Sequence, residues 1–79
     1  MRIKITEYWN KIIDDSNAPF GTRVLPEYEA KRTSYINGNL DELKKRYEKH
    51  SRMTIYADKI VEDCGKQYGI HSFVEICRD

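Results

Sequence analysis

The sequence predicts an α+β fold, a small single domain over residues 1–79 that is helix-dominated, with short N- and C-terminal strands packed against two or three helices. Three observations predict it: residues 1–5 alternate in polarity, a helix-capping pattern precedes residue 40, and the last ten residues are rich in β-branched and aromatic types. A chain of this length has no room for a second domain, because domains rarely contain fewer than about 50 residues.

The N-terminal residues 1–5 alternate, which predicts a short strand with Ile3 and Ile5 on one face. Thr6 then suits the N-cap of a helix over residues 7–15. The apolar stripe of that helix would consist of Tyr8, Trp9, Ile12 and Ile13. A continuous helix from residue 3 is the competing interpretation.

Residues 14–21 are predicted to form a loop, because Pro19 and Gly21 follow a run of short polar side chains. Residues 22–36 fit either a helix or a strand. Pro26 suits a first helical position and acidic residues follow it, which favours a helix. The β-branched and aromatic residues at both ends of the segment favour a strand.

The second half of the chain opens with a turn at Asn37-Gly38. Asn39 and Glu42 have the spacing of a capping box and predict a helix over residues 40–50. Its buried face would carry Leu40, Leu43 and Tyr47. A further helix is expected from Arg52 to a C-terminal cap at Gly69, with the stripe Met53, Ala57, Ile60, Val61, Cys64 and Tyr68. Residues 70–77 are expected to form a terminal strand.

Charge and composition exclude several classes of protein. The chain has 14 Lys and Arg against 13 Asp and Glu, which gives a net charge of +1. The chain as a whole therefore has no strong positive potential that would attract nucleic acid. No apolar run approaches the roughly 20 residues of a membrane span, and no leader opens the chain, so a cytoplasmic location without membrane attachment is expected. In that compartment Cys64 and Cys77 are expected to be free buried thiols, a disulfide being the alternative.

Motifs for catalysis or metal binding are missing from the sequence. The potential zinc ligands His50, Cys64, His71 and Cys77 include no closely spaced pair. There is no phosphate-binding glycine loop and no nucleophile motif. We therefore expect a protein that is not an enzyme and holds no cofactor and no metal.

Aromatic side chains point instead to recognition of another protein, because Trp, Tyr and Phe dominate interface hot spots. Residues 17–23 would present Phe20 and Arg23 on a loop shaped by proline and glycine. The partner-binding candidates are Tyr8, Trp9, Phe20, Arg23 and Tyr47. The expected function is a non-catalytic protein-binding module that acts stoichiometrically as an inhibitor or adaptor. In size and composition alone the chain resembles the small regulators by which phages and mobile elements block host machinery, including anti-defence proteins.

A small nucleic-acid-binding regulator is the alternative. Residues 44–52 hold five basic residues and one acid, and Lys45, Lys49 and Arg52 are the candidate contacts. Opposite charges four residues apart also fit a solvated helix face. Residues 60–78 resemble a degenerate helix-turn-helix, with Gly65 at the helix crossing, but Glu75 stands where the second helix needs an apolar residue.

Overall fold

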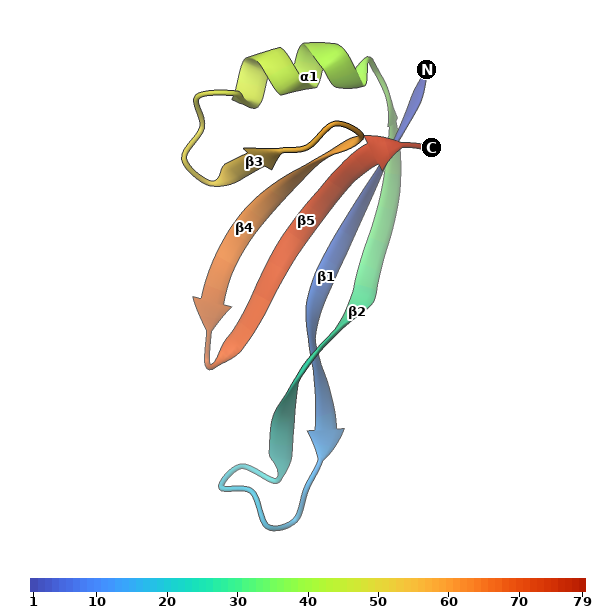
Figure 1. Ribbon diagram of the computed structural model, residues 1–79. Helices are drawn as coiled ribbons and strands as arrows, with labels where there is room; N and C mark the ends of the chain where they lie inside the picture. Colours follow the sequence, from blue (N-terminus) through green and yellow to red (C-terminus); the bar gives the residue numbers. More distant parts are fainter.

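The computed structural model describes all residues 1–79 and consists of one five-stranded antiparallel sheet and one short helix (Figure 1). The strand order across the sheet is β2-β1-β5-β4-β3. The elements in chain order are β1 (Arg2–Asp14), β2 (Thr22–Asn37), α1 (Leu40–Tyr47), β3 (Met53–Ile55), β4 (Lys59–Gln67) and β5 (Ile70–Arg78). No helix is long and apolar enough to cross a membrane.

The predicted helix-dominated fold is wrong, because α1 has only 8 residues and strands form most of the chain. Residues 7–15, predicted as a helix, lie in β1 as far as Asp14. Residues 22–36, whose sequence fits either a helix or a strand, belong to β2. The long helix predicted from Arg52 to Gly69 is replaced by β3, β4 and a tight turn. These segments pair with strands far away in the sequence, and that pairing overrides their helical spacing.

The helix beginning at Leu40 and the C-terminal strand are confirmed, although the helix ends at Tyr47 and not at the predicted residue 50. The Asn39 side chain accepts hydrogen bonds from the backbone N–H groups of Asp41 (2.8 Å) and Glu42 (3.4 Å) and so caps α1. Residues 70–78 form β5. The predicted loop after β1 is also present, because residues 15–21 connect β1 to β2.

The hydrophobic core is small and lies between α1 and one end of the sheet. Its buried members are Ile3, Leu40, Ile60 and Ile76. Register explains Ile60 and Ile76, because these two lie opposite each other and the half-buried Ile5 lies opposite Ile76 on the other side. Side chains on one face of neighbouring strands therefore meet under the helix. The other face of the sheet is not covered by any element (Figure 1).

At the end away from α1 the sheet divides into two hairpins, β1–β2 and β4–β5 (Figure 1). The β1–β2 hairpin is the longer one, and the molecule measures 48 × 24 × 16 Å. Its pairing shifts where β2 passes from Tyr28, opposite Asn10, to Val24, opposite Ile12. Three residues of β2 thus oppose one of β1, and the middle one, Pro26, has no N–H to give to a ladder. This bulge bends the hairpin.

Candidate protein-binding cleft

The two hairpins separate at Asn10 and His71. Regular pairing of β1 with β5 ends at Trp9 and Ser72. The same register would place Asn10 opposite His71 as the next pair. Instead the Asn10 side chain, which is buried, accepts a hydrogen bond from the His71 backbone N–H at 2.8 Å through its Oδ1 atom. A side chain therefore replaces the backbone ladder at the point where the strands diverge.

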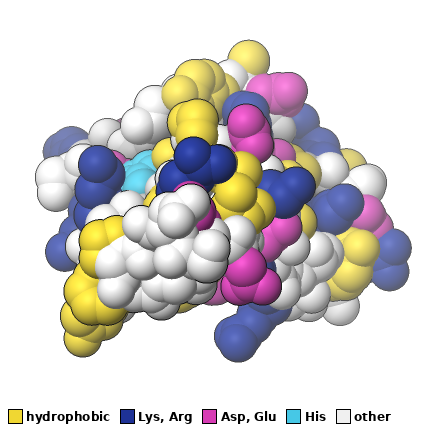
Figure 2. All heavy atoms as spheres, turned by 90° about the horizontal axis from the view of Figure 1, so that it is seen from below, with side chains coloured by type: hydrophobic (Ala, Val, Ile, Leu, Met, Phe, Trp, Pro, Cys, Tyr) yellow, Lys and Arg dark blue, Asp and Glu magenta, His cyan; other side chains and the backbone are white.

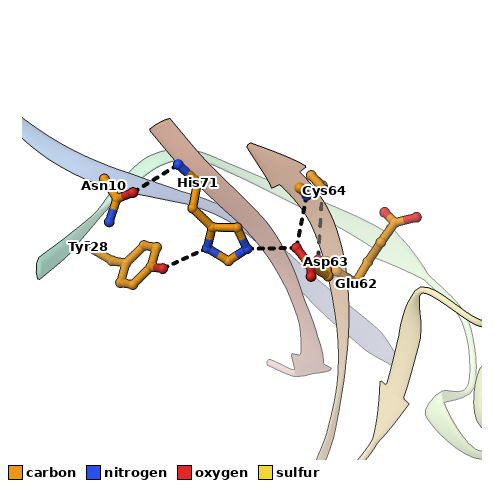
Figure 3. Close-up of polar contacts among 7 residues, drawn as sticks. Asn10, Tyr28, Glu62, Asp63, Cys64 and His71 are labelled. Atoms are coloured by element: carbon orange, nitrogen blue, oxygen red, sulfur yellow. Dashed lines mark hydrogen bonds and ion pairs between the residues drawn. The ribbon is translucent and has the colours of Figure 1, made fainter. Parts of the chain in front are cut away.

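The His71 ring links the hairpins a second time (Figure 3). Its Nδ1 atom lies 2.6 Å from the Tyr28 hydroxyl of β2, and its Nε2 atom lies 2.7 Å from Oδ1 of Asp63 on β4. An ionised carboxylate only accepts, so Nε2 carries the hydrogen and, in neutral His71, Nδ1 accepts from the Tyr28 hydroxyl. Hydrogen bonds from the Gly65 backbone and from His71 hold the pKa of Asp63 below its usual range.

An aromatic cluster continues from this junction along the uncovered face. Tyr8 and Phe73 stack with centroids 5.0 Å apart and planes 20° from parallel. Tyr28 meets Phe73 edge-on at 5.0 Å. These rings fill the space between β2, β1 and β5, so the cluster supports the sheet where no helix covers it. The His71 network serves the same end, because Asn10, Tyr28 and Asp63 all use their polar atoms within the fold.

Below the junction the hairpins enclose an open cleft with a polar and an apolar part. The polar part, about 590 Å³, is lined by residues that include Asn10, Tyr28, Lys66 and His71. The apolar part, about 500 Å³, lies nearer the hairpin ends, and we call it the tip cleft. Its lining residues are Ile12, Phe20, Thr22, Val24, Tyr68 and Ile70. Figure 2 looks at the molecule from this end and shows apolar side chains in yellow among basic and acidic ones.

Two large rings stand at the tip cleft almost fully in solvent: Phe20 is 93% exposed and Tyr68 is 91% exposed. Such exposure is unusual for Phe, which is most often buried. Ile12 and Val24 are also exposed, at 38% and 36%. The exposed apolar surface is therefore contiguous, in contrast to the single scattered apolar residues of an ordinary surface.

Tyr68 is held at the tip by an unfavourable backbone conformation. It occupies the two-residue turn between β4 and β5 with φ 55°, and Gly69 follows with φ 77°. Both positions of such a turn need positive φ, which glycine, asparagine and aspartate adopt readily and tyrosine does not. Backbone strain of this kind is concentrated at functional sites.

Of the partner-binding residues predicted from sequence, two reach the same end of the molecule. Phe20 lines the tip cleft, and Arg23 lies on β2 near it, with Nε 3.7 Å from Asp15 Oδ2. Tyr8 belongs to the aromatic cluster. Trp9 lies on the opposite face, half-buried, and donates from Nε1 to Glu7 Oε1 at 2.7 Å. Tyr47 ends α1 and packs against the core.

The basic candidates lie at the other end. Lys45 is on α1, and Lys49 and Arg52 are in the connection to β3, all three exposed and without an ion pair. The oppositely charged residues four apart on α1 form no ion pair within 4 Å either. The helix-turn-helix interpretation of residues 60–78 is wrong, because these residues form the β4–β5 hairpin.

The sequence interpretation missed the residues that complete the cleft, chiefly Tyr68, Ile70, Val24 and His71. One signal for them was present. Tyr68-Gly69 is a two-residue, glycine-containing link between two strand-length segments, which is typical of a hairpin. Taking Gly69 as a helix cap hid that signal.

The remaining reactive groups form no further site. No group of three or more His, Cys, Asp or Glu side chains has an arrangement that could hold a metal ion. Cys64 and Cys77 are free thiols, and Cys64 is exposed, contrary to expectation. Although the residue is exposed, partial burial of its sulfur, followed by the nearby Glu62 carboxylate, raises the pKa of the Cys64 thiol. This is opposite to the shift that activates a nucleophile.

Comparisons with known proteins give no match: no family model fits the chain, and no curated protein or solved structure is significantly similar to it.

Proposed function

We propose that this protein is a non-catalytic protein-binding module that acts stoichiometrically, as an inhibitor or adaptor, through the tip cleft. The observation that supports it best is the pair of exposed rings, Phe20 and Tyr68, beside an apolar recess. Large apolar side chains exposed together on a small domain mark sites that a partner covers. Inhibition of host machinery by a phage or mobile-element protein is the setting that we propose, on size and composition.

The mechanism would be occlusion. Phe20 and Tyr68 would insert as anchors into a pocket of the partner, and an apolar side chain of the partner would enter the tip cleft between them. The polar part of the cleft, with the Lys66 ammonium on its lining, would orient the partner. A standard interface needs about 800 Å² from each side, a modest share of the 6002 Å² surface of this chain.

Affinity capture from the source cell, followed by titration with the purified partner, tests the proposal. We expect a saturable complex of fixed stoichiometry, weakened at least tenfold by Phe20→Ser or Tyr68→Ser. Tyr56→Ser is the matched control, because Tyr56 is also exposed, at 49%, but lies outside the tip cleft. Circular dichroism should show all three variants folded. Binding that survives both tip substitutions would refute the proposed site.

A nucleic-acid-binding regulator is a second candidate, because Lys45, Lys49 and Arg52 are exposed and carry no ion pair. Phosphate contacts by such residues make affinity fall steeply with salt. The candidate predicts salt-sensitive retention on immobilised single-stranded or duplex DNA, lost in the Lys45→Glu, Lys49→Glu, Arg52→Glu variant. Retention that is absent at low salt would eliminate it.

A further inference from the structure

The outer edge of β2 carries free backbone hydrogen-bonding groups whose positions can be derived. Gly38 N–H donates to the Met1 carbonyl at 2.9 Å, at the end of the ladder in which Arg2 lies opposite Asn37. Residues of an antiparallel strand alternate in the side to which they present N–H and C=O. Even-numbered residues from 32 to 38 therefore bond to β1, and Thr33, Tyr35 and Asn37 present both groups outward.

This part of the edge lacks the usual protection against pairing. Charges, proline and bulges shield exposed edges in most proteins, and on β2 they lie at residues 23–32. Residues 33–37 are uncharged, and their register with β1 is regular. Tyr35 and Ile36 are 48% and 45% exposed. The C-terminal end of β2, residues 33–37, is thus an open template for another strand.

We propose that β2 pairs antiparallel with β2 of a second copy of this chain, with the two-fold axis at Tyr35. This register places Tyr35 opposite Tyr35 of the other copy. Thr33 of each copy then lies opposite Asn37 of the other copy. Thr33, Tyr35 and Asn37 of each strand then each donate their N–H to the other copy and accept a hydrogen bond from it through their C=O. A register centred on Ser34 would pair Thr33 with Tyr35 and leave Asn37 opposite Lys31. At Lys31 a second register shift, between Glu7 and Tyr8 of β1, interrupts the pairing of β2 with β1. The Tyr35 register is therefore preferred.

Charge complementarity supports a second copy as the occupant. With Tyr35 on the axis, Arg32 of one copy lies opposite Gly38 of the other. A groove of about 230 Å³ at Gly38 is bordered by Ile36, Glu42 and Arg46. Arg32 and Glu42 are both exposed, and neither forms an ion pair within the chain. We expect Arg32 to meet Glu42 rather than Arg46 there, because Glu42 lies in the first turn of α1, next to Gly38, and Arg46 lies in the last turn. The two-fold symmetry would form this contact twice.

The dimer does not depend on the proposed function, because the tip cleft lies at the other end of the chain's long hairpin (Figure 1). In the dimer, two tip clefts would point away from a continuous central sheet. The competing hypothesis is that the edge of β2 pairs with a strand of a different protein. In that case the purified chain should be a monomer.

Sedimentation equilibrium on the purified chain, from about 5 to about 500 µM, tests the proposal by mass action. We expect a reversible rise from the 9.4 kDa monomer to twice that mass. Arg32→Glu and Glu42→Arg should each weaken the dimer at least about tenfold, and the double variant should restore it, because the swap rebuilds both contacts. A chain that stays monomeric throughout, or a double variant no better than the singles, would overturn the proposal.

Disulfide trapping tests the register separately. In a Cys64→Ser, Cys77→Ser background, Tyr35→Cys should give an oxidised covalent dimer, because opposite residues of a hydrogen-bonded pair have Cα atoms about 5.5 Å apart. Thr33→Cys is the matched control, since its counterpart would lie opposite Asn37, beyond disulfide reach. Circular dichroism confirms that each variant is folded. Equal trapping at both positions, or trapping at Thr33→Cys alone, would contradict the Tyr35 axis.

Discussion

The Tyr28 hydroxyl lies 2.6 Å from Nδ1 of His71, although the two residues are 43 positions apart in the chain. This contact joins β2 to β5 across β1, at the level where β1 and β5 cease to pair. Tyr28→Phe would remove it and keep the ring against Phe73. We expect the free energy of unfolding to fall by about 0.5–1 kcal/mol in urea denaturation. Tyr35→Phe, measured as a monomer, is the control, because Tyr28 is the only tyrosine whose hydroxyl forms a hydrogen bond within the chain.

The Asn10 side chain should matter more than its solvent-facing neighbours, because Asn10 is only 7% exposed and satisfies the backbone N–H of His71. Asn10→Ala would leave that N–H without its partner, and the expected loss is about 1–3 kcal/mol. Hydrogen exchange of the His71 amide should accelerate in parallel. An unchanged exchange rate in the variant would show that the side chain does not secure the junction.

Stability in acid should depend on Asp63. The pKa of Asp63 is lowered in the folded chain, by the Gly65 N–H first and then by His71. Its contribution to the free energy of unfolding is therefore present above the unfolded pKa near 3.8 and is lost as the pH falls through the lower folded pKa. Wild type should therefore be more stable than Asp63→Asn at pH 6, and the difference should shrink below about pH 4. Urea denaturation of both proteins across this range measures it; a difference independent of pH would contradict the assignment.

The Cys64 thiol should react slowly for an exposed cysteine. Its pKa is raised, chiefly by burial of the sulfur and then by Glu62, and the thiolate is the reactive form. In a Cys77→Ser background at pH 8, we expect modification by a thiol-specific reagent to be slower in the folded chain than in urea. Equal rates in both states would show that the fold does not protect the thiol.

The sequence predicted the elements that local chemistry determines and failed where distant pairing determines them. The cap at Asn39 and the β-branched tail identify α1 and β5 from neighbouring residues alone. Tyr8, Trp9, Ile12 and Ile13 have helical spacing, yet they lie in β1 because β2 and β5 flank that strand on both sides. For the same reason, only part of the candidate site could be predicted from the sequence. Phe20 could be proposed from its loop, whereas Tyr68 and His71 reach the cleft only through the β4–β5 hairpin.

Tyr68 should show a conflict between stability and binding. Asn adopts positive φ more easily than Tyr, so Tyr68→Asn should stabilise the turn with Gly69 by up to about 1 kcal/mol. The same change removes a ring that is 91% exposed and contributes little to the fold. We therefore expect higher resistance to urea together with at least tenfold weaker binding of the partner that the wild-type chain captures. Gln67→Asn, next to the turn on β4, is the control for both measurements. If Tyr68→Asn gains stability and binds as tightly as wild type, the strained tyrosine is not an anchor, and binding through the tip cleft would depend on Phe20.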